Sequence, residues 1–316
     1  MDPRFVEQVA AGLGTEPGLV EKEWHVVRAL RVIADVDLGE ARPIFSGGTS
    51  LSVGWGLIRR FSEDIDFKVA MPPPTNPSRG RAQRRKFRED VLSALTDAGF
   101  RLVCEPRKSS AFFAADFIYP NAFDPVAGLR PHIQVEMTFG PPALSPVERP
   151  LRSLVAQAQR AEPEIAAFPC VDPVETAADK LSALAWRVCA RSRGSPKDDP
   201  TIIRHLHDLA ALETRIAADP AFELLLKEAA SADTGRGGGL VPKHPSDRFG
   251  QMLQRLATDS LWAAEYVKFV NDKSFANPNS RISFSNALAA AARLLSQFAL
   301  ESKLYPTLIS SPAEDK

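Results

Sequence analysis

The feature that most constrains this chain is a short stretch, residues 64–69, in which charged and apolar side chains alternate. Asp64, Asp66 and Lys68 alternate with apolar neighbours, and this period of two indicates a strand with one buried face. The other face then carries the carboxylates of Asp64 and Asp66 side by side. Two carboxylates this close repel each other, and a divalent cation between them relieves the repulsion. The alternation therefore predicts a sheet and, on its polar face, a metal site.

The surrounding pattern predicts mixed helices and strands first and helices afterwards. Apolar residues at helical spacing predict a helix over 19–34, and a second helix is expected from Ser78, as N-cap, to Gly99. Further strands are expected at 100–106, 111–119 and 132–139. Asp172 followed by Pro173 is a strong helix start. Helices are expected at 172–191, 201–214, 218–230, 247–272 and 284–303.

Length and composition bound the class of protein. A chain of 316 residues suggests two domains. The break at 140–146, GPPALSP, separates an expected first domain, 1–150, from a helical domain, 151–316. With 39 basic and 39 acidic residues the net charge is zero, which excludes a highly basic nucleic-acid coat protein. Ordinary proportions of hydrophobic (44%) and charged (25%) residues exclude a disordered chain.

The cysteines and the N-terminus indicate the compartment. The three cysteines are far apart and form no CxxC pair, so a disulfide framework or a structural zinc site is not expected. The N-terminus lacks the pattern of a signal peptide, and no stretch has the length of a membrane span. We expect a cytoplasmic protein with no membrane partner.

A third carboxylate is expected to complete the metal site. In 132–139 apolar residues alternate with Gln134 and Glu136, so Glu136 joins the pair if its strand lies beside that of Asp64 and Asp66. Hard oxygen ligands suit Mg²⁺ or Mn²⁺, which also bind substrate phosphates. Upstream, Gly47 and Gly48 let the backbone approach a triphosphate closely. By itself, a pair of aspartates on a strand is more often solvated surface.

Basic residues form two groups. Lys180, Arg187 and Arg191 fall on one stripe of the helix expected at 172–191, which suits triphosphate binding or simply a solvated face. The helix from Ser78 carries a cluster that could bind RNA phosphates or merely face solvent; its members are Arg79, Arg81, Arg84, Arg85, Lys86 and Arg88.

The stretch GGTSLSVGWGLIRRFSEDIDF, residues 47–67, resembles the nucleotidyltransferase motif of the AbiEii/AbiGii toxin family, which includes MenT-type toxins. EKEW at 21–24 is similar to the family's N-terminal helix. ADKLSAL at 178–184 and RHLHDL at 204–209 are similar to two later segments. The resemblance touches about residues 20–212 and no segment after them.

The resemblance implies a polymerase-β-like nucleotidyltransferase core, a small mixed sheet with flanking helices, as the catalytic domain over 1–150. It also implies that the mostly helical domain over 151–316 completes the nucleotide and acceptor cleft. It implies that Asp64, Asp66 and Glu136 hold Mg²⁺, that Lys180 binds the nucleoside triphosphate, and that Asp208 is needed for activity. The nucleotide-binding residues that it implies are Gly47, Gly48, Thr49, Ser50, Ser62, Lys180 and Arg187. Ser62 also matches the motif serine that some kinase-type antitoxins phosphorylate.

The sequence departs from the family pattern at His205 and His207, where the family has Asp and Tyr. Arg204 and Asp208 are four residues apart, and a surface ion pair without a role in activity is the alternative interpretation of them.

The expected function is transfer of NMP from an NTP to RNA, at the 3′ end of tRNA, by a toxin with a cognate antitoxin. Two alternatives remain: transfer to a hydroxyl of a protein or small molecule, and a non-catalytic module that binds nucleotide or RNA.

Overall fold

In the computed structural model the described residues are 1–126, 129–196 and 198–296. The chain divides into two compact units, Met1–Asp172 and Pro173–Lys316. The division falls later than position 150, because the segment after GPPALSP continues the sheet of the first unit. No helix of the described residues is long and apolar enough to cross a bilayer.

The first unit is built on a mixed sheet, which has eight strands within the described residues and the order β3-β5-β6-β2-β1-β8-β7, with β4 also paired to β5. The strands are β1 Arg42–Ser46, β2 Asp64–Ala70, β3 Arg101–Leu102, β4 Arg107–Lys108, β5 Phe112–Ile118, β6 Ile133–Phe139, β7 Val147–Leu151 and β8 Ile165–Cys170. At its centre β2 runs parallel to β6 and antiparallel to β1. The expected α+β class is confirmed.

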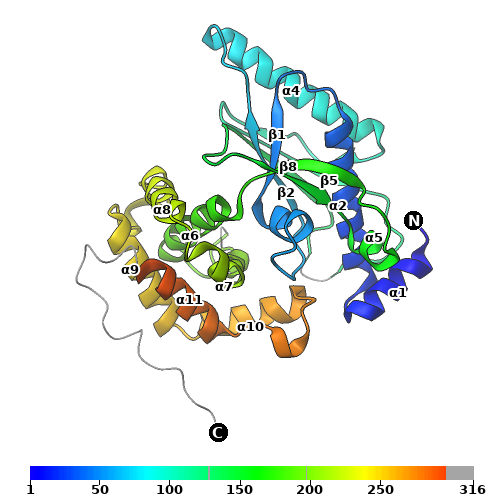
Figure 1. Cartoon of the computed structure of the whole chain (residues 1–316). Coiled ribbons are helices and arrows are strands. Elements are labelled where there is room, and N and C mark those ends of the chain that lie inside the picture. The colour runs from blue at the N-terminus through cyan, green and yellow to red at the C-terminus, as the bar shows by residue number, and fades with distance from the viewer. Residues whose placement is uncertain (127–128, 197, 297–316) are drawn as a thin grey trace. The chain divides into compact units, whose positions relative to one another are not determined.

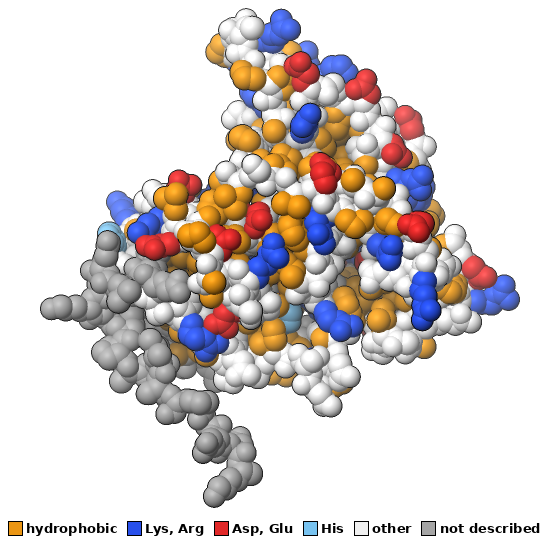
Figure 2. Space-filling view, viewed as in Figure 1, with side chains coloured by type: hydrophobic (Ala, Val, Ile, Leu, Met, Phe, Trp, Pro, Cys, Tyr) orange, Lys and Arg blue, Asp and Glu red, His pale blue; other side chains and the backbone are white. Residues whose placement is uncertain are grey.

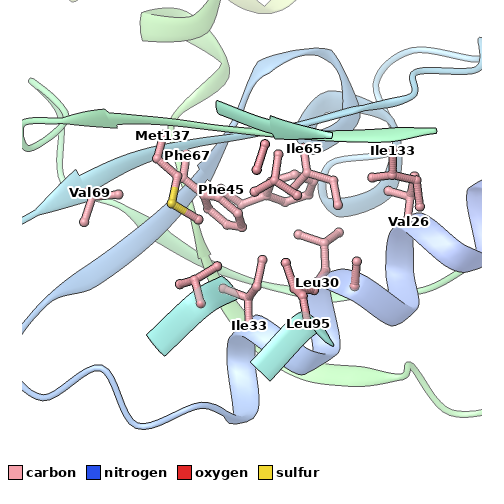
Figure 3. Packing of buried hydrophobic residues seen from close by; sticks show 14 of the residues in the cluster. Val26, Leu30, Ile33, Phe45, Ile65, Phe67, Val69, Leu95, Ile133 and Met137 are labelled. Atoms are coloured by element: carbon pink, nitrogen blue, oxygen red, sulfur yellow. The ribbon is translucent and has the colours of Figure 1, made fainter. Parts of the chain in front are cut away.

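Two long helices cover one face of this sheet, α2 Pro17–Asp35 and α4 Pro77–Asp97 (Figure 1). The alternation that marked β2 appears as alternating burial, and Ile65 and Phe67 point into the core. Leu30 of α2 and Leu95 of α4 belong to the same core cluster (Figure 3). The charged residues of β2 therefore lie on the opposite face of the sheet.

Shorter elements complete this unit: α1 Pro3–Leu13, α3 Gly47–Thr49, a π-helical turn Ser50–Gly54 and α5 Leu154–Gln159. The N-cap of α4 is Asn76 rather than Ser78, because the Asn76 side chain accepts the N–H of Arg79. Sequence patterns missed β7 and β8. Both contain a proline, and β7 lies at the edge of the sheet with an irregular register between Arg149 and Leu151, so regular alternation is lost.

The second unit is helical over its described residues. Its helices are α6 Pro173–Ala190, α7 Arg204–Ile216, α8 Ala221–Ala232, α9 Pro245–Thr258, α10 Leu261–Lys273 and α11 Phe284–Ser296, with short 3₁₀ turns at Pro200–Ile203, Gly238–Leu240 and Pro278–Ser280. The single helix expected over 247–272 is wrong. Asp259 has an extended backbone and its side chain accepts the N–H of Leu261, which separates α9 from α10. The expected end of the last helix, residue 303, lies outside the described residues.

Candidate active site

The register between β2 and β6 places the acidic residues in one patch. In this parallel pair Asp66 is opposite Glu136, and Asp64 is opposite Gln134. Buried Ile65 points into the core, so both aspartates point to the other face, where Glu136 also lies half-buried. Neighbouring strands are about 4.8 Å apart. Three carboxylates therefore share one face of two adjacent strands.

The glycine pair packs directly against this patch. Gly47 has a φ of 73°, and a Cβ atom there would stand 2.0 Å from Oδ2 of Asp66. A Cβ on Gly48 would stand 2.7 Å from Nη2 of Arg60 and 2.9 Å from Oγ of Ser62. Gly47 requires glycine for its backbone conformation and for space, and a larger residue at Gly48 would displace the Arg60 and Ser62 side chains. The turn after β1 is thereby held against Asp66 and Ser62.

Replacing Gly47 with alanine is expected to reduce the catalytic activity of this site about a hundredfold, because Asp66 or the turn must move by an ångström or more. The left-handed backbone adds a cost of about 1 kcal/mol in folding stability. Gly56→Ala is the matched control, since Gly56 has a similar φ of 64° with nothing within 4 Å of the added Cβ. It should show the backbone cost alone and keep activity. Equal activity in both variants would contradict the tight packing of Asp66. Urea unfolding and initial rates measure the two effects.

The hydroxyl groups of the glycine-rich turn are turned inward. Thr49 is fully buried and its Oγ1 donates a hydrogen bond to the backbone carbonyl of Asp64. Ser50 is 1% exposed and lies beside the Cys170 thiol, whose pKa burial raises to about 12. The Thr49 side chain therefore joins the turn to the strand of the carboxylates. Nucleotide binding by Thr49 and Ser50 stays a prediction.

Arg130 is a site residue that the sequence analysis missed. Its Nη1 lies 2.5 Å from Oδ1 of Asp64 and 2.7 Å from Oε1 of Gln134. Burial lowers the pKa of Arg130, but the carboxylates of Asp64, Glu63 and Glu136 outweigh it, and the pKa is raised. The patch thus has its own counter-ion. Arg130 stands in an irregular segment with no periodic pattern, so the sequence held no signal for it.

A buried ion pair holds the backbone of Arg130 in place. The ammonium group of Lys22, on α2, pairs with Glu63 and donates to the backbone carbonyl of Arg130 at 2.6 Å. Glu63 also accepts the backbone N–H of Arg130 at 3.1 Å. Lys22 is 4% exposed, and burial lowers its pKa against the attraction of Glu63. The EKEW segment therefore fixes the start of β2 and the chain around Arg130.

The other two acids of EKEW bind backbone amides. Glu21 accepts the N–H groups of Ala122 and Phe123, at 2.7 and 3.2 Å. Glu23 accepts that of Leu154 at 3.0 Å, and burial raises the pKa of Glu23 from 4.5 to about 8. These contacts hold a loop of the first unit and the start of α5 to α2.

The buried carboxyl of Glu23 predicts a loss of stability with rising pH. The folded chain keeps this proton to about pH 8, whereas the unfolded chain releases it near 4.5. The free energy of unfolding should therefore fall by about 1 kcal/mol between pH 7 and 8. Glu23→Gln keeps an acceptor for Leu154 and should abolish this fall. Urea unfolding at the two pH values measures it, and an unchanged slope in Glu23→Gln would contradict the assignment. His25, whose pKa burial lowers to about 4, contributes only below this window.

The donor set suits a hard divalent cation. Three carboxylates on one face offer the oxygen ligands that Mg²⁺ prefers. In the described part of the chain no three His, Cys, Asp or Glu side chains are drawn together closely enough to hold a metal. Asp64 accepts a hydrogen bond from Arg130, and the Asp66 side chain packs against Gly47. The chemistry of the residues fits the ion, and the role of the three carboxylates as ligands stays a prediction.

In the second unit the two predicted residues Lys180 and Asp208 are partners. Lys180 on α6 places its Nζ 2.8 Å from Oδ2 of Asp208 on α7. The Lys180 side chain is 8% exposed and that of Asp208 is fully buried. His207 Nδ1 lies 3.5 Å from the other carboxylate oxygen of Asp208. Asp208 is therefore part of a buried ion pair between helices rather than of a surface pair.

The basic stripe of α6 is divided between different roles. Arg187 lies 3.8 Å from Asp199, half in solvent. Arg191 binds both oxygens of Glu265 at 2.6 and 2.8 Å, so it is a structural residue within this unit. Burial, and after it the charge of Lys180, lowers the pKa of His205 well below its usual value. His205 is neutral at pH 7 and buried.

The basic cluster of α4 lies on the helical layer, which covers the face of the sheet opposite to the carboxylates. Arg85 is 3.9 Å from Glu89, and the Arg88 guanidinium lies 5.0 Å from the centre of the Phe139 ring. Arg81 donates to Ser78, and Arg84 is half-buried. Along the upper rim of Figure 2, where Figure 1 places α4, basic and acidic side chains are mixed. RNA binding by Arg81, Arg84, Arg85 and Arg88 stays a prediction.

Comparison with known proteins supplies the family. Residues 28–290 match the family model of the nucleotidyl transferase AbiEii toxin of type IV toxin–antitoxin systems. A comparison with curated proteins finds no significant match. Among solved structures, the fold is similar to the nucleotidyltransferase toxin MenT4 from Mycobacterium tuberculosis H37Rv, with a TM-score of 0.56 and 19% identity over 97% of this chain and 91% of that one. The family match spans most of the sequence, and the chain therefore belongs to the AbiEii family of nucleotidyltransferase toxins of type IV toxin–antitoxin systems.

Proposed function

We propose that this nucleotidyltransferase transfers NMP from an NTP to RNA, at the 3′ end of tRNA, with Mg²⁺ held by Asp64, Asp66 and Glu136. The observation that carries the proposal is the register of β2 and β6, which sets Asp66 opposite Glu136 on the face that Asp64 shares. The AbiEii family supports the reaction class, and the resemblance of the sequence motifs supports the RNA acceptor.

The residues of the first unit have separable tasks in this reaction. When bound, the metal neutralises the phosphates and lowers the pKa of the attacking hydroxyl. Gly47 and Gly48 let their turn pack closely against Asp66 and Ser62, and the triphosphate would bind to the backbone of this turn. The acceptor hydroxyl gives its proton to the solvent, its oxygen bonds to the α-phosphorus, and the bond to pyrophosphate breaks. Arg130 offers the carboxylates a counter-ion.

The second unit and the partners belong to the same proposal. The resemblance assigns Lys180 to the triphosphate, and its ion pair with buried Asp208 gives the ammonium group a fixed position. Membership of a type IV toxin–antitoxin family implies an antitoxin partner. We propose that the chain acts in the cytoplasm, where NTP and tRNA are present.

The test is a labelling assay with the purified chain, Mg²⁺, total tRNA and each of four α-labelled NTPs in turn. Label on tRNA that is lost with EDTA supports the proposal and identifies the base. Pyrophosphate release with no label on tRNA refutes the tRNA acceptor and indicates a hydroxyl of a protein or small molecule. Nucleotide binding without turnover under any acceptor would indicate a binding module.

A further inference from the structure

The sheet continues beyond the carboxylates as one row of residues. Asp66 on β2 is opposite Glu136 on β6, Glu136 is opposite Ala114 on β5, and Ala114 is opposite Arg107 on β4. Residues directly opposite each other in adjacent strands point to the same face of a sheet. The row therefore runs from two carboxylates, past a methyl group, to a guanidinium at the sheet edge.

A side-chain contact confirms which face Arg107 occupies. Its Nη2 lies 3.7 Å from Oδ1 of Asp116. Asp116 in turn accepts the side-chain amide of Gln134, whose oxygen binds Arg130 at the carboxylate patch. The Arg107 side chain is 57% exposed, and a distance of 3.7 Å is beyond hydrogen-bond range. More than half of the Arg107 side chain is therefore open to solvent, on the face of the carboxylates.

The neighbouring cation points the other way. Lys108 is opposite Phe113, which is buried in the core on the helical face of the sheet. Its side chain is 58% exposed, and its Nζ lies 3.2 Å from Glu105. Lys108 thus matches Arg107 in charge, exposure, strand and ion pairing, and differs in the face of the sheet to which it belongs.

The reaction geometry assigns the two sides of β2 different ligands. In phosphoryl transfer the attacking oxygen and the leaving group are roughly in line across the phosphorus. The glycine-rich turn, where the leaving pyrophosphate is expected, follows β1 on one side of β2. The attacking hydroxyl must then approach from the other side, over β6 and β5.

We propose that the 3′-terminal strand of the acceptor RNA lies across β6, β5 and β4, and that Arg107 binds one of its backbone phosphates. This proposal rests on the proposed function, because it assumes an RNA acceptor. Three strand spacings, about 14 Å, separate the backbones of Asp66 and Arg107, which places Arg107 beyond the reacting ribose at a preceding nucleotide. Ala114 is 1% exposed, so the contacts fall on Glu136 and Arg107 at either end of the row.

The experiment compares Arg107→Ala with Lys108→Ala in the full chain. Removing one phosphate contact should raise the KM for tRNA about tenfold and lower the logarithmic salt slope of RNA binding by about 0.7. We expect kcat and the KM for NTP to stay unchanged. Lys108→Ala should match the wild type. An equal rise in both variants, or a rise in neither, overturns the proposal.

A binding measurement separates this proposal from the proposed function. The probe is a short fluorescent single-stranded RNA with a 3′-deoxy end, which binds but cannot accept NMP. The site is wrong and the proposed function stands if the wild type binds the probe and labels tRNA, and Arg107→Ala binds the probe as tightly as Lys108→Ala does. If the wild type neither binds nor labels RNA, the RNA acceptor and this site both fail. Weaker binding by Arg107→Ala alone supports the site.

Discussion

Replacing Asp66 with asparagine is expected to reduce nucleotidyl transfer at least a thousandfold and to leave the chain folded. Asparagine keeps the shape of the side chain that packs against Gly47, but it removes the negative charge that the proposed function assigns to metal binding. A loss of about 4 kcal/mol in transition-state stabilisation corresponds to this factor. Initial rates with labelled NTP and tRNA at saturating Mg²⁺ measure the loss.

Folding must be shown separately, because a misfolded chain also loses activity. Asp66 and Glu136 are like charges on opposite residues of adjacent strands, so the neutral variant should melt within about 3 °C of the wild type. Asp97→Asn, at the exposed end of α4, is the matched control and should keep full activity. Activity within tenfold of the wild type in Asp66→Asn would show that Asp66 is not a metal ligand.

The shared face of Asp64 and Asp66 was predictable from the sequence, because it depends on a local pattern. Alternation in residues 64–69 and 132–139 settles which side chains share a face, and β2 and β6 follow those patterns closely. The sequence predicts that Glu136 joins Asp66 only if the two strands are neighbours, since alternation within a strand carries no information about its neighbour in the sheet. The register is a tertiary property.

The contacts that Arg130, Lys22 and Glu63 make around the carboxylates could not be predicted from local patterns. Arg130 lies in irregular chain, and its contact with Asp64 spans 66 residues of sequence. Lys22 and Glu63 come from a helix and from the residue before a strand, and their pairing depends on how α2 packs on the sheet. In the sequence, EKEW carries only a resemblance to the family's N-terminal helix. Burial alone distinguishes its charged side chains from those of an exposed helix.

Replacing Lys22 with methionine is expected to lower the free energy of unfolding of the first unit by about 3–5 kcal/mol, because one partner of a buried ion pair is lost. Methionine fills a similar volume, so the loss is electrostatic. It leaves the carboxylate of Glu63 without its ammonium partner and removes a donor to the backbone carbonyl of Arg130. Urea unfolding followed by tryptophan fluorescence measures the change.

The matched control is Lys86→Met, a lysine on the exposed part of α4 whose ion pair with Asp90 lies mostly in solvent. It should leave the free energy of unfolding close to that of the wild type, because water screens an exposed ion pair. Adding Glu63→Leu to Lys22→Met should recover part of the loss, because it removes the uncompensated charge. Similar free energies of unfolding for Lys22→Met and Lys86→Met would contradict a supporting role for the Lys22–Glu63 pair.

Lys22→Met also tests the candidate active site, because Glu63 precedes Asp64 and accepts the backbone N–H of Arg130. If Lys22 holds the carboxylates and Arg130 in position, the rate of nucleotidyl transfer falls in Lys22→Met under conditions where the chain is still folded.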